Sequence, residues 1–248
     1  MPLPASDVRR APSLTRQCVV LAGGLATRMR PLTLEVPKSM LIVADRPFVD
    51  WQLEKLAACG FGDVVMCVAH LGEQIERHVG DGARFGVRVR YSREGETLLG
   101  TAGALRAAID LLAPTFLVTY GDSYLPFDYD EPLRELDRHE DCDGVMSVFK
   151  NAGKWDASNV QTDGGWVNRY EKGTTDGALD HIDYGALALR RSVILGLAAG
   201  GASSLSVVQT ELARAHKMRA VVAEHRFYEI GSKEGLAELD RALSGEQS

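Results

Sequence analysis

Apolar runs alternate with helical patterns between Cys18 and Asp122, and this alternation constrains the fold more than any other feature of the sequence. The continuous apolar runs at 63–69 and 116–120 are typical of parallel strands that are buried on both faces of a sheet. This half of the chain therefore predicts an α/β fold with a mainly parallel sheet covered by helices. The predicted strands are 18–22, 63–69, 87–92 and 115–122, and the predicted helices are 47–60, 72–80 and 101–112.

After Asp122 the pattern changes to segments that favour antiparallel strands added to the same mixed sheet. Strands are expected at 144–150 and 181–190, and a hairpin at 159–172 that turns at 163–165. A helix with a serine cap (203–217), a strand (219–230) and an amphipathic helix (232–245) follow. We expect a single domain over 17–248, behind a flexible leader over 1–16.

Composition limits the classes of protein to which the chain can belong. With 248 residues, 45% of them hydrophobic, the chain can bury a large core. A net charge of −6, from 28 Lys and Arg against 34 Asp and Glu, argues against nucleic-acid binding. No apolar run is long enough for a membrane span, and the four cysteines form no CxxC pair. We expect a cytoplasmic protein, with reduced thiols and without nucleic-acid or membrane partners.

A turn rich in glycine and positive charge follows the first predicted strand. Its sequence, LAGGLATRMRPLTLEVPKSM, runs from Leu21 to Met40. Glycines let backbone amides approach an anion, and Arg28 and Lys38 add a guanidinium fork and a compact ammonium charge. The turn matches neither GxxxxGK[ST] nor GxGxxG. The glycines alone are explained equally well by a tight exit from a strand or by a phosphate site.

The stretch LAGGLATRMRPLT with VPKS after it resembles the signature of the sugar-phosphate nucleotidylyltransferases, GGxGTRxxPxT followed by PK. The resemblance implies a Rossmann-like three-layer α/β sandwich and a reaction that joins a nucleoside triphosphate to a sugar 1-phosphate with release of pyrophosphate. It divides the chain into a nucleotide-binding half, 17–122, and a sugar-phosphate-binding half, 123–248. Ala26 replaces the family's second glycine, a change that is tolerated if its φ stays negative. The implied nucleotide contacts from this stretch are Leu21, Ala22, Gly23, Gly24, Thr27 and Arg28.

The segment LGTAGAL, residues 99–105, looks like the family's base-recognition loop. Gly100 and Gly103 would let the backbone approach the base, and Thr101 and Glu94 are assigned to the same nucleotide site. Thr101 could instead simply start the helix that follows, and both roles could hold at once.

Asp122 in YGDS ends an apolar strand, where α/β sheets hold ligands, although carboxylates at strand ends are often only caps. In the family this aspartate binds Mg²⁺ together with a second carboxylate near the C-terminus. Here FYEIGS supplies Glu229, a Glu where the family has Asp. The extra methylene makes coordination water-mediated or requires a backbone shift.

The resemblance also implies a site for the sugar phosphate. YEKG looks like the family's EKP element, so Lys172 would hold the phosphate and Glu171 a hydroxyl, although an exposed Glu and Lys at a strand edge are common. HIDYG stands where the family has its sugar loop, and a turn-forming Asn in WDASNV is as plausible as a sugar contact. The implied substrate-binding residues are Tyr120, Asn159, Glu171, Lys172, Asp183 and Gly185.

The two cations carry the chemistry that the resemblance implies. Arg28 would hold the β- and γ-phosphates and Lys38 would lie near the α-phosphate. The base loop resembles that of mannose and heptose 1-phosphate guanylyltransferases, while other segments resemble uridylyltransferases, so GTP is expected and UTP, CTP and dTTP stay open. A non-catalytic nucleotide-sensing homologue stays open too, and a dinucleotide-binding reductase is disfavoured. We expect a monomer or homodimer serving nucleotide-sugar and polysaccharide biosynthesis.

Overall fold

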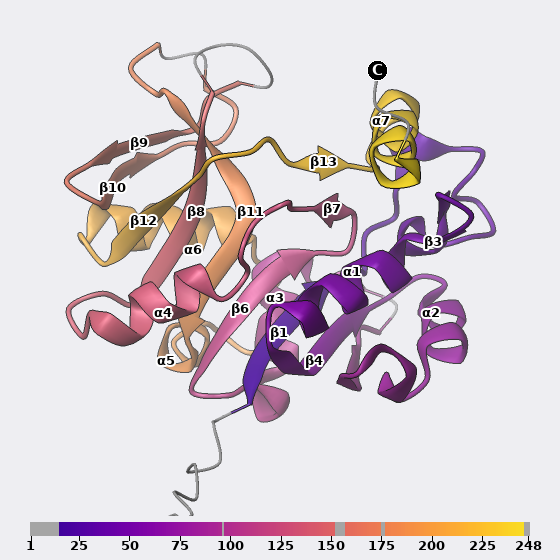
Figure 1. Cartoon of the computed structure of the whole chain (residues 1–248). Coiled ribbons are helices and arrows are strands. Elements are labelled where there is room, and N and C mark those ends of the chain that lie inside the picture. Colours follow the sequence, from indigo (N-terminus) through magenta and orange to yellow (C-terminus); the bar gives the residue numbers. More distant parts are fainter. Residues whose placement is uncertain (1–14, 96, 152–156, 175–176, 246–248) are drawn as a thin grey trace, which may run out of the picture.

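The computed structural model describes residues 15–95, 97–151, 157–174 and 177–245, so most of the expected leader, 1–16, lies outside the described residues. The main sheet of the described chain has nine strands in the order β5-β4-β1-β6-β11-β8-β12-β10-β9 (Figure 1). Its strands are β1 (Arg16–Leu21), β4 (Phe61–Val68), β5 (Arg88–Arg93), β6 (Thr115–Tyr120), β8 (Gly144–Lys150), β9 (Val160–Asp163), β10 (Trp166–Tyr170), β11 (His181–Arg190) and β12 (Met218–Ala223).

The strand pairing differs between the two halves of the chain. β5, β4, β1 and β6 run parallel to one another, as the alternation before Asp122 predicts. β11 is antiparallel to both β6 and β8, and the predicted hairpin forms β9 and β10. β12 returns parallel to β8. The fold is therefore a mixed α/β fold, and each antiparallel pair of the main sheet includes a strand from the second half, as predicted.

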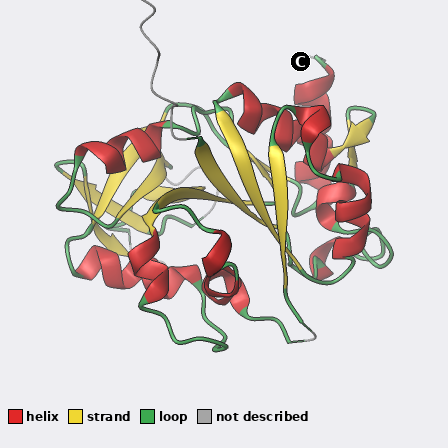
Figure 2. Cartoon of the chain, turned by 90° about the horizontal axis from the view of Figure 1, so that it is seen from below, coloured by secondary structure: helices red, strands yellow, loops and turns green. Residues whose placement is uncertain are grey.

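Helices cover both faces of the sheet (Figure 2). Alternate residues of β1 face opposite sides: Val20 packs in one core cluster with Leu53 of α1, and Val19 in another with Leu105 of α3. The first cluster also receives α4, and the second receives α6. The helices are α1 (Phe48–Ala58), α2 (Gly72–Val79), α3 (Gly100–Ala107), α4 (Glu131–Arg138), α5 (Arg191–Leu195), α6 (Leu205–Arg214) and α7 (Lys233–Ser244).

Several predicted boundaries were wrong. The helix predicted at 101–112 ends at Ala107 and continues as a separate 3₁₀ turn, Ile109–Leu111. The strand predicted at 219–230 breaks after Ala223, because the chain leaves the sheet and forms β13 (Tyr228–Glu229) against β7 (Ser123–Tyr124). The sequence interpretation missed α4, and it missed α5, whose five residues are too few for a clear helical period. A third small pairing joins β2 (Ile42–Val43) to β3 (Arg46–Pro47).

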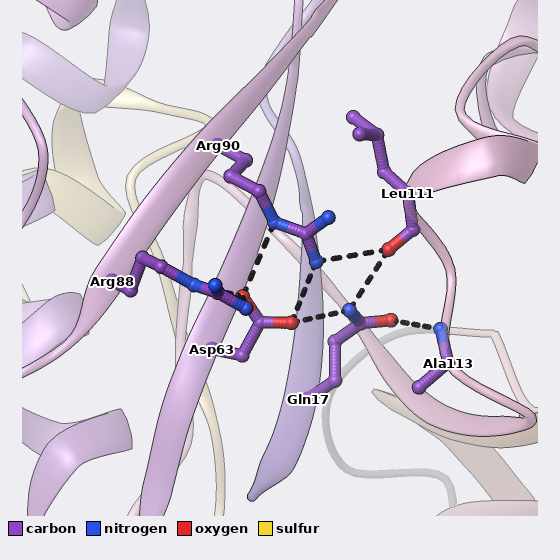
Figure 3. A network of polar contacts seen from close by, with 6 residues as sticks. All are labelled: Gln17, Asp63, Arg88, Arg90, Leu111 and Ala113. Atoms are coloured by element: carbon purple, nitrogen blue, oxygen red, sulfur yellow. Dashed lines mark hydrogen bonds and ion pairs between the residues drawn. The ribbon is translucent and has the colours of Figure 1, made fainter.

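A network of polar side chains ties together the amino ends of β1, β4 and β5 (Figure 3). Asp63, only 7% exposed, accepts hydrogen bonds from Gln17 (2.6 Å) and from Arg90 (2.7 Å), and Arg88 lies 3.2 Å away. Burial alone would raise the pKa of Asp63, but the hydrogen bonds from Gln17 and Arg90 and the arginine charges outweigh it and leave the pKa lowered. Asp63, Arg88 and Arg90 thus form a cluster of paired charges that connects the amino ends of these strands.

No helix in the described ranges is both long and apolar enough to cross a bilayer. Cys18, Cys67 and Cys142 are buried free thiols and Cys59 is half-buried, so the four cysteines are mostly core residues. Burial raises the pKa of the Cys18 thiol well above its usual range, which keeps that thiol neutral.

Candidate functional site

A cavity of about 230 Å³ opens at the carboxyl ends of β1 and β6, opposite the edge that holds Asp63. α3 begins at its wall, and the turn after β1 forms its rim. Of the residues predicted for the nucleotide site, those that line it are Leu21, Ala22, Gly23, Gly24, Glu94, Gly100 and Thr101. Lys38, Tyr120 and Asp122 line it as well. The sequence interpretation did not single out the remaining lining residues, Ser39, Cys67, Leu98, Ala104 and Gly121.

The two glycines of the turn after β1 have different surroundings. A Cβ at Gly23 would lie 3.0 Å from Glu94 Oε1 and 3.2 Å from Ala69 Cβ, so a side chain there would press on the cavity wall. Gly24 is exposed and meets nothing within 4 Å, which leaves its backbone accessible to a ligand. Ala26 does not meet the condition of a negative φ, because its φ is +48°. Thr33 Oγ1 donates to Ala26 O at 2.8 Å and holds the residue in this left-handed conformation.

The two predicted cations and the two predicted carboxylates converge near Gly231. Lys38 Nζ lies 2.7 Å from Asp122 Oδ2. A methyl group built at Gly231 would have Lys38 Nζ at 4.0 Å, Arg28 Nη2 at 3.8 Å and Glu229 Oε2 at 3.9 Å. Three charged groups therefore surround one glycine, and Asp122 joins them through its ion pair with Lys38.

Pairing of β7 with β13 brings Glu229 beside Asp122. In this pairing Glu229 is opposite Ser123, and Ile230 N–H donates to Asp122 O at 2.9 Å. The Lys38 and Asp122 side chains are 16% and 29% exposed, so both can be reached from solvent. Arg28 and Glu229 are exposed.

The donor set in this cluster fits Mg²⁺. Mg²⁺ prefers carboxylate oxygens and is commonly held by one or two carboxylates, with phosphate oxygens and water as the other ligands. Asp122 and Glu229 offer such a pair. Among the described residues no group of three or more His, Cys, Asp or Glu is placed to hold a metal by itself. A metal at this position would therefore share its coordination with a bound ligand.

The glycines of the 99–105 loop pack against the segment that precedes α6. Gly100 has φ +71°, and a Cβ there would lie 2.6 Å from Ser203 O. A Cβ at Gly103 would lie 2.8 Å from Leu99 Cβ and 3.0 Å from Gly201 O. Their need for glycine is thus explained inside the protein, and of the two only Gly100 lines the cavity.

Thr101 does not cap α3, contrary to the alternative interpretation. α3 begins at Gly100 with no side-chain cap, and Thr101 Oγ1 accepts from Leu205 N–H at 2.8 Å, at the start of α6. Glu94 braces the same loop, because its Oε2 accepts from Leu99 N–H at 2.7 Å. Burial, and after it the Glu94 charge, raise the pKa of Cys67 to about 12, so this lining thiol is neutral and is no nucleophile.

Asp183 and Tyr120 meet beside the cavity. Asp183 accepts hydrogen bonds from Gln209 Nε2 at 2.8 Å and Gly185 N–H at 3.1 Å, and burial raises its pKa. Tyr120 lies 3.6 Å from the position of a Cβ at Gly185, whose φ is +92°. Burial, then the negative charge of Asp183, raises the pKa of Tyr120 well above its ordinary value. The predicted sugar residues Tyr120, Asp183 and Gly185 are therefore neighbours.

Asn159 supports Asp183 through the backbone. Its Oδ1 accepts from Asp183 N–H at 2.8 Å, its own N–H donates to His181 O, and its carbonyl accepts from Glu171 N–H. These bonds join β11 to the hairpin. The Asn159 side chain thus bonds the backbone of β11 and forms no turn, and its contact with a sugar stays a prediction.

Glu171 and Lys172 lie apart from the first cavity. Both are exposed and line a second cavity of about 670 Å³ between β10 and α6. Glu171 Oε2 is paired with Arg169 Nη2 at 2.5 Å. Lys172 still acts on Asp183, because its charge is among the influences that lower the pKa of this buried carboxyl. Thr27, Arg28 and Gly103 are also outside the lining of the first cavity.

A protein-family model described as nucleotidyl transferase matches residues 17–155. An N-acetylmuramate alpha-1-phosphate uridylyltransferase of Neisseria meningitidis serogroup B is 42% identical over 114 residues, which are 46% of this chain and 49% of that protein. The mannose-1-phosphate guanylyltransferase catalytic subunit beta of Xenopus tropicalis is 31% identical over 160 residues, 62% of this chain and 44% of that protein. The chain thus spans about half the length or less of these curated relatives.

A solved structure of HddC from Yersinia pseudotuberculosis superposes with a TM-score of 0.76 over 92% of this chain and 100% of that one, at 22% identity. At this level of identity the likeness establishes the fold alone. The superposition extends well past residue 155, so the shared fold includes the second half of the chain.

Proposed function

The chain belongs to the nucleotidyl transferase family, and from this we propose that it is a sugar-1-phosphate nucleotidylyltransferase, which converts a nucleoside triphosphate and a sugar 1-phosphate to a nucleotide sugar and pyrophosphate. The observation that carries the proposal is the convergence of Arg28, Lys38 and Glu229 around Gly231. Lys38 is also paired with Asp122, and these two residues line a cavity rimmed by a glycine-rich turn. Curated relatives that act on sugar 1-phosphates support it. We extend the proposal to a Rossmann-like three-layer sandwich in one domain, with the nucleotide bound by 17–122 and the sugar phosphate by 123–248.

The reaction needs alignment and charge neutralisation. An oxygen of the sugar 1-phosphate attacks the α-phosphorus in line, the new P–O bond forms as the α–β P–O bond breaks, and pyrophosphate leaves. Arg28 holds the β- and γ-phosphates and Lys38 neutralises charge at the α-phosphate. No general base is required, because a phosphate monoester is already ionised near neutral pH.

Asp122 and Glu229 would hold Mg²⁺, and the bound cation would supply positive charge to the phosphate oxygens. In the structure Lys38 neutralises Asp122. When a triphosphate binds, Lys38 gains a second anionic partner, so its ammonium group can turn toward the phosphate. The Asp122 carboxylate is then no longer paired with the ammonium group and can bind a cation.

Glu94 supports the choice of GTP. A carboxylate only accepts hydrogen bonds, and guanine presents neighbouring N–H donors on its Watson–Crick edge, whereas uracil presents one N–H between two carbonyl oxygens. Glu94 lines the cavity with Oε1 near Gly23. Glu94→Gln is expected to shift the preference from GTP toward UTP by about tenfold, since an amide can both donate and accept. Competition between the two triphosphates in one assay measures this ratio, and an unchanged ratio would remove Glu94 from base recognition.

For the sugar we propose a mannose- or heptose-type 1-phosphate, with hydroxyls bound by Asp183 and the phosphate by Lys172. Tyr120, Gly185, Asn159 and Glu171 complete this site in the proposal. The uridylyltransferase relative keeps other triphosphates and sugars open as alternatives.

The test is a pyrophosphate-release screen of GTP, UTP, CTP, dTTP and ATP against a panel of sugar 1-phosphates, with Mg²⁺ present. We expect release with one sugar 1-phosphate and the highest rate with GTP. Tight nucleotide binding without release from any pair would contradict the transferase proposal and support a non-catalytic nucleotide sensor.

A further inference from the structure

The buried face of α1 contains one side chain that breaks its apolar pattern. Gln52 lies between Val49, Leu53 and Leu56 on the face that packs against the sheet, and it is 1% exposed. A primary amide in such a place destabilises the fold unless its hydrogen bonds are made, so its partners indicate what it does.

Those partners are the two ends of the turn that carries Asp122. Gln52 Nε2 donates to Tyr120 O at 2.7 Å and to Ser123 O at 3.2 Å. Tyr120 is the last residue of β6 and Ser123 the first of β7, so a single amide group spans the intervening Gly121 and Asp122.

Other main-chain bonds fix the same turn from different directions. Gly121 N–H donates to Leu21 O at 2.9 Å, which extends the β1–β6 ladder, and Ile230 N–H donates to Asp122 O at 2.9 Å. The hydrogen bonds from Gln52 fix the turn from the side of α1. Together these bonds determine where the Asp122 side chain begins and therefore where its carboxylate points.

The amide oxygen of Gln52 argues against a role in stability alone. Gln52 Oε1 is buried and has no hydrogen-bond partner within the described part of the chain. An unpaired buried oxygen costs free energy, and methionine, of nearly the same shape, would fill the site without that cost. The benefit of glutamine must then come from the two carbonyl oxygens that it holds.

We propose that Gln52 is a positioning residue that orients Asp122 toward Mg²⁺ by clamping the turn from Tyr120 to Ser123. The inference rests on the proposed function, in which Asp122 is the metal ligand. Gln52 touches neither substrate nor metal in this proposal, and it acts only through the backbone of the turn.

The experiment compares Gln52→Met with the wild type in three measurements. We expect the Mg²⁺ concentration for half-maximal pyrophosphate release to rise about 10-fold or more, the range for residues that orient a metal ligand. Calorimetry without sugar phosphate measures the affinity for GTP with and without Mg²⁺. The gain in affinity that Mg²⁺ provides should fall by a similar factor in the variant. Deuterium exchange should be faster in a peptide covering 119–124. Unchanged Mg²⁺ dependence together with unchanged exchange would overturn the proposal.

Gln17→Met is the matched control. Gln17 is also a buried glutamine that donates to a main-chain carbonyl, Leu111 O at 3.0 Å, but it lies at the opposite edge of the sheet (Figure 3). It should lose stability and keep the wild-type Mg²⁺ requirement. An equal rise of the half-maximal Mg²⁺ concentration in both variants would overturn the proposal, because a general loss of stability would then explain the effect.

Gln52→Glu covers the case in which the methionine variant fails to fold. The protonated carboxyl of this variant can donate one hydrogen bond, and its carboxylate can donate none. The ratio of the half-maximal Mg²⁺ concentration in the variant to that in the wild type should therefore increase as pH rises. A constant ratio across pH would contradict the clamp. If the wild type releases no pyrophosphate from any pair, the proposed function fails, while deuterium exchange at 119–124 still decides whether Gln52 holds the turn.

Discussion

At the scale of single residues, Lys38 has the clearest chemistry, because its ammonium group lies 2.7 Å from Asp122 and both side chains can be reached from solvent. Lys38→Ala is expected to lower kcat by about 10²–10³, the cost of removing one preorganised donor from a developing charge. Steady-state pyrophosphate release measures it. Lys217→Ala serves as the control, since that lysine bonds Asp141 O far from the cavity. A near-normal kcat for Lys38→Ala would contradict the assignment.

Ala26 shows how one side chain strains the turn. An L-residue with a left-handed φ destabilises the folded state by about 1–2 kcal/mol, and glycine removes this strain. Glycine also gives the unfolded chain more conformational freedom, which destabilises the protein by about 0.4–1 kcal/mol. Ala26→Gly should therefore stabilise the protein by up to about 1 kcal/mol, measured by urea unfolding. Ala237→Gly, on an exposed face of α7, should do the opposite by about 1 kcal/mol. Destabilisation by Ala26→Gly would show that the methyl group makes contacts that matter.

At the scale of elements, the sequence could predict which strand ends carry chemistry but not which distant segments pair. Asp122 lies two residues beyond the end of a recognisable apolar strand, so its position at the carboxyl edge follows from the pattern. The break after Ala223 does not, because β13 exists only through its pairing with β7, and such a pairing leaves no local periodicity. The same limit applies to Gln52, which appears as one polar residue in a helical stripe until the turn it contacts is known.

The amino ends of β1, β4 and β5 form a unit that we expect to matter for stability alone. Asp63→Asn leaves Arg90 without its carboxylate, and we expect a loss of about 2–3 kcal/mol, less than for a fully buried pair because Arg90 is partly exposed. Asp128→Asn, which breaks an exposed pair with Arg134, should cost less than about 1 kcal/mol. Turnover should be unchanged in both variants.

The pH dependence of the Asp63 effect has a definite sign. The pKa of Asp63 is lowered in the folded state, so its contribution is present above the unfolded value of about 3.9 and is lost as pH falls through the folded pKa. The stability difference between the wild type and Asp63→Asn should therefore shrink in acid. A difference that stays constant down to pH 2 would indicate that the charge of Asp63 is not what stabilises the strands.

At the scale of the whole molecule, the site combines parts that the family signature predicts with parts that only the fold determines. The glycine turn, Lys38 and Asp122 follow from local sequence, and the structure brings them together. Glu171 and Lys172, which the resemblance assigns to the sugar phosphate, line the second cavity and not the first, because the twist and register of a hairpin decide which way its end faces. Residues on short antiparallel additions are therefore the hardest to place from sequence.

Asp183 links stability and function across the second half of the molecule. Burial raises its folded pKa, so its favourable contribution is complete below the unfolded value of about 3.9 and is lost as pH rises through the folded pKa. Asp183→Asn should consequently raise Tm at neutral pH and leave it unchanged near pH 3. Gln209 can rotate its amide so that its oxygen accepts from the new amide group, which keeps the hydrogen bond.

The same substitution should weaken the enzyme, because a charged acceptor for a sugar hydroxyl is lost. A hydrogen bond to a charged group contributes about 1.5–3 kcal/mol, so KM for the sugar 1-phosphate should rise about 10- to 100-fold while KM for the triphosphate stays constant. Asp180→Asn is the control, since its exposed carboxylate bonds His181 on the same strand end without facing Gln209. A gain in Tm without a rise in KM would mean that Asp183 is a buried structural acid, and the sugar would then have to be bound elsewhere, with the second cavity as the next site to test.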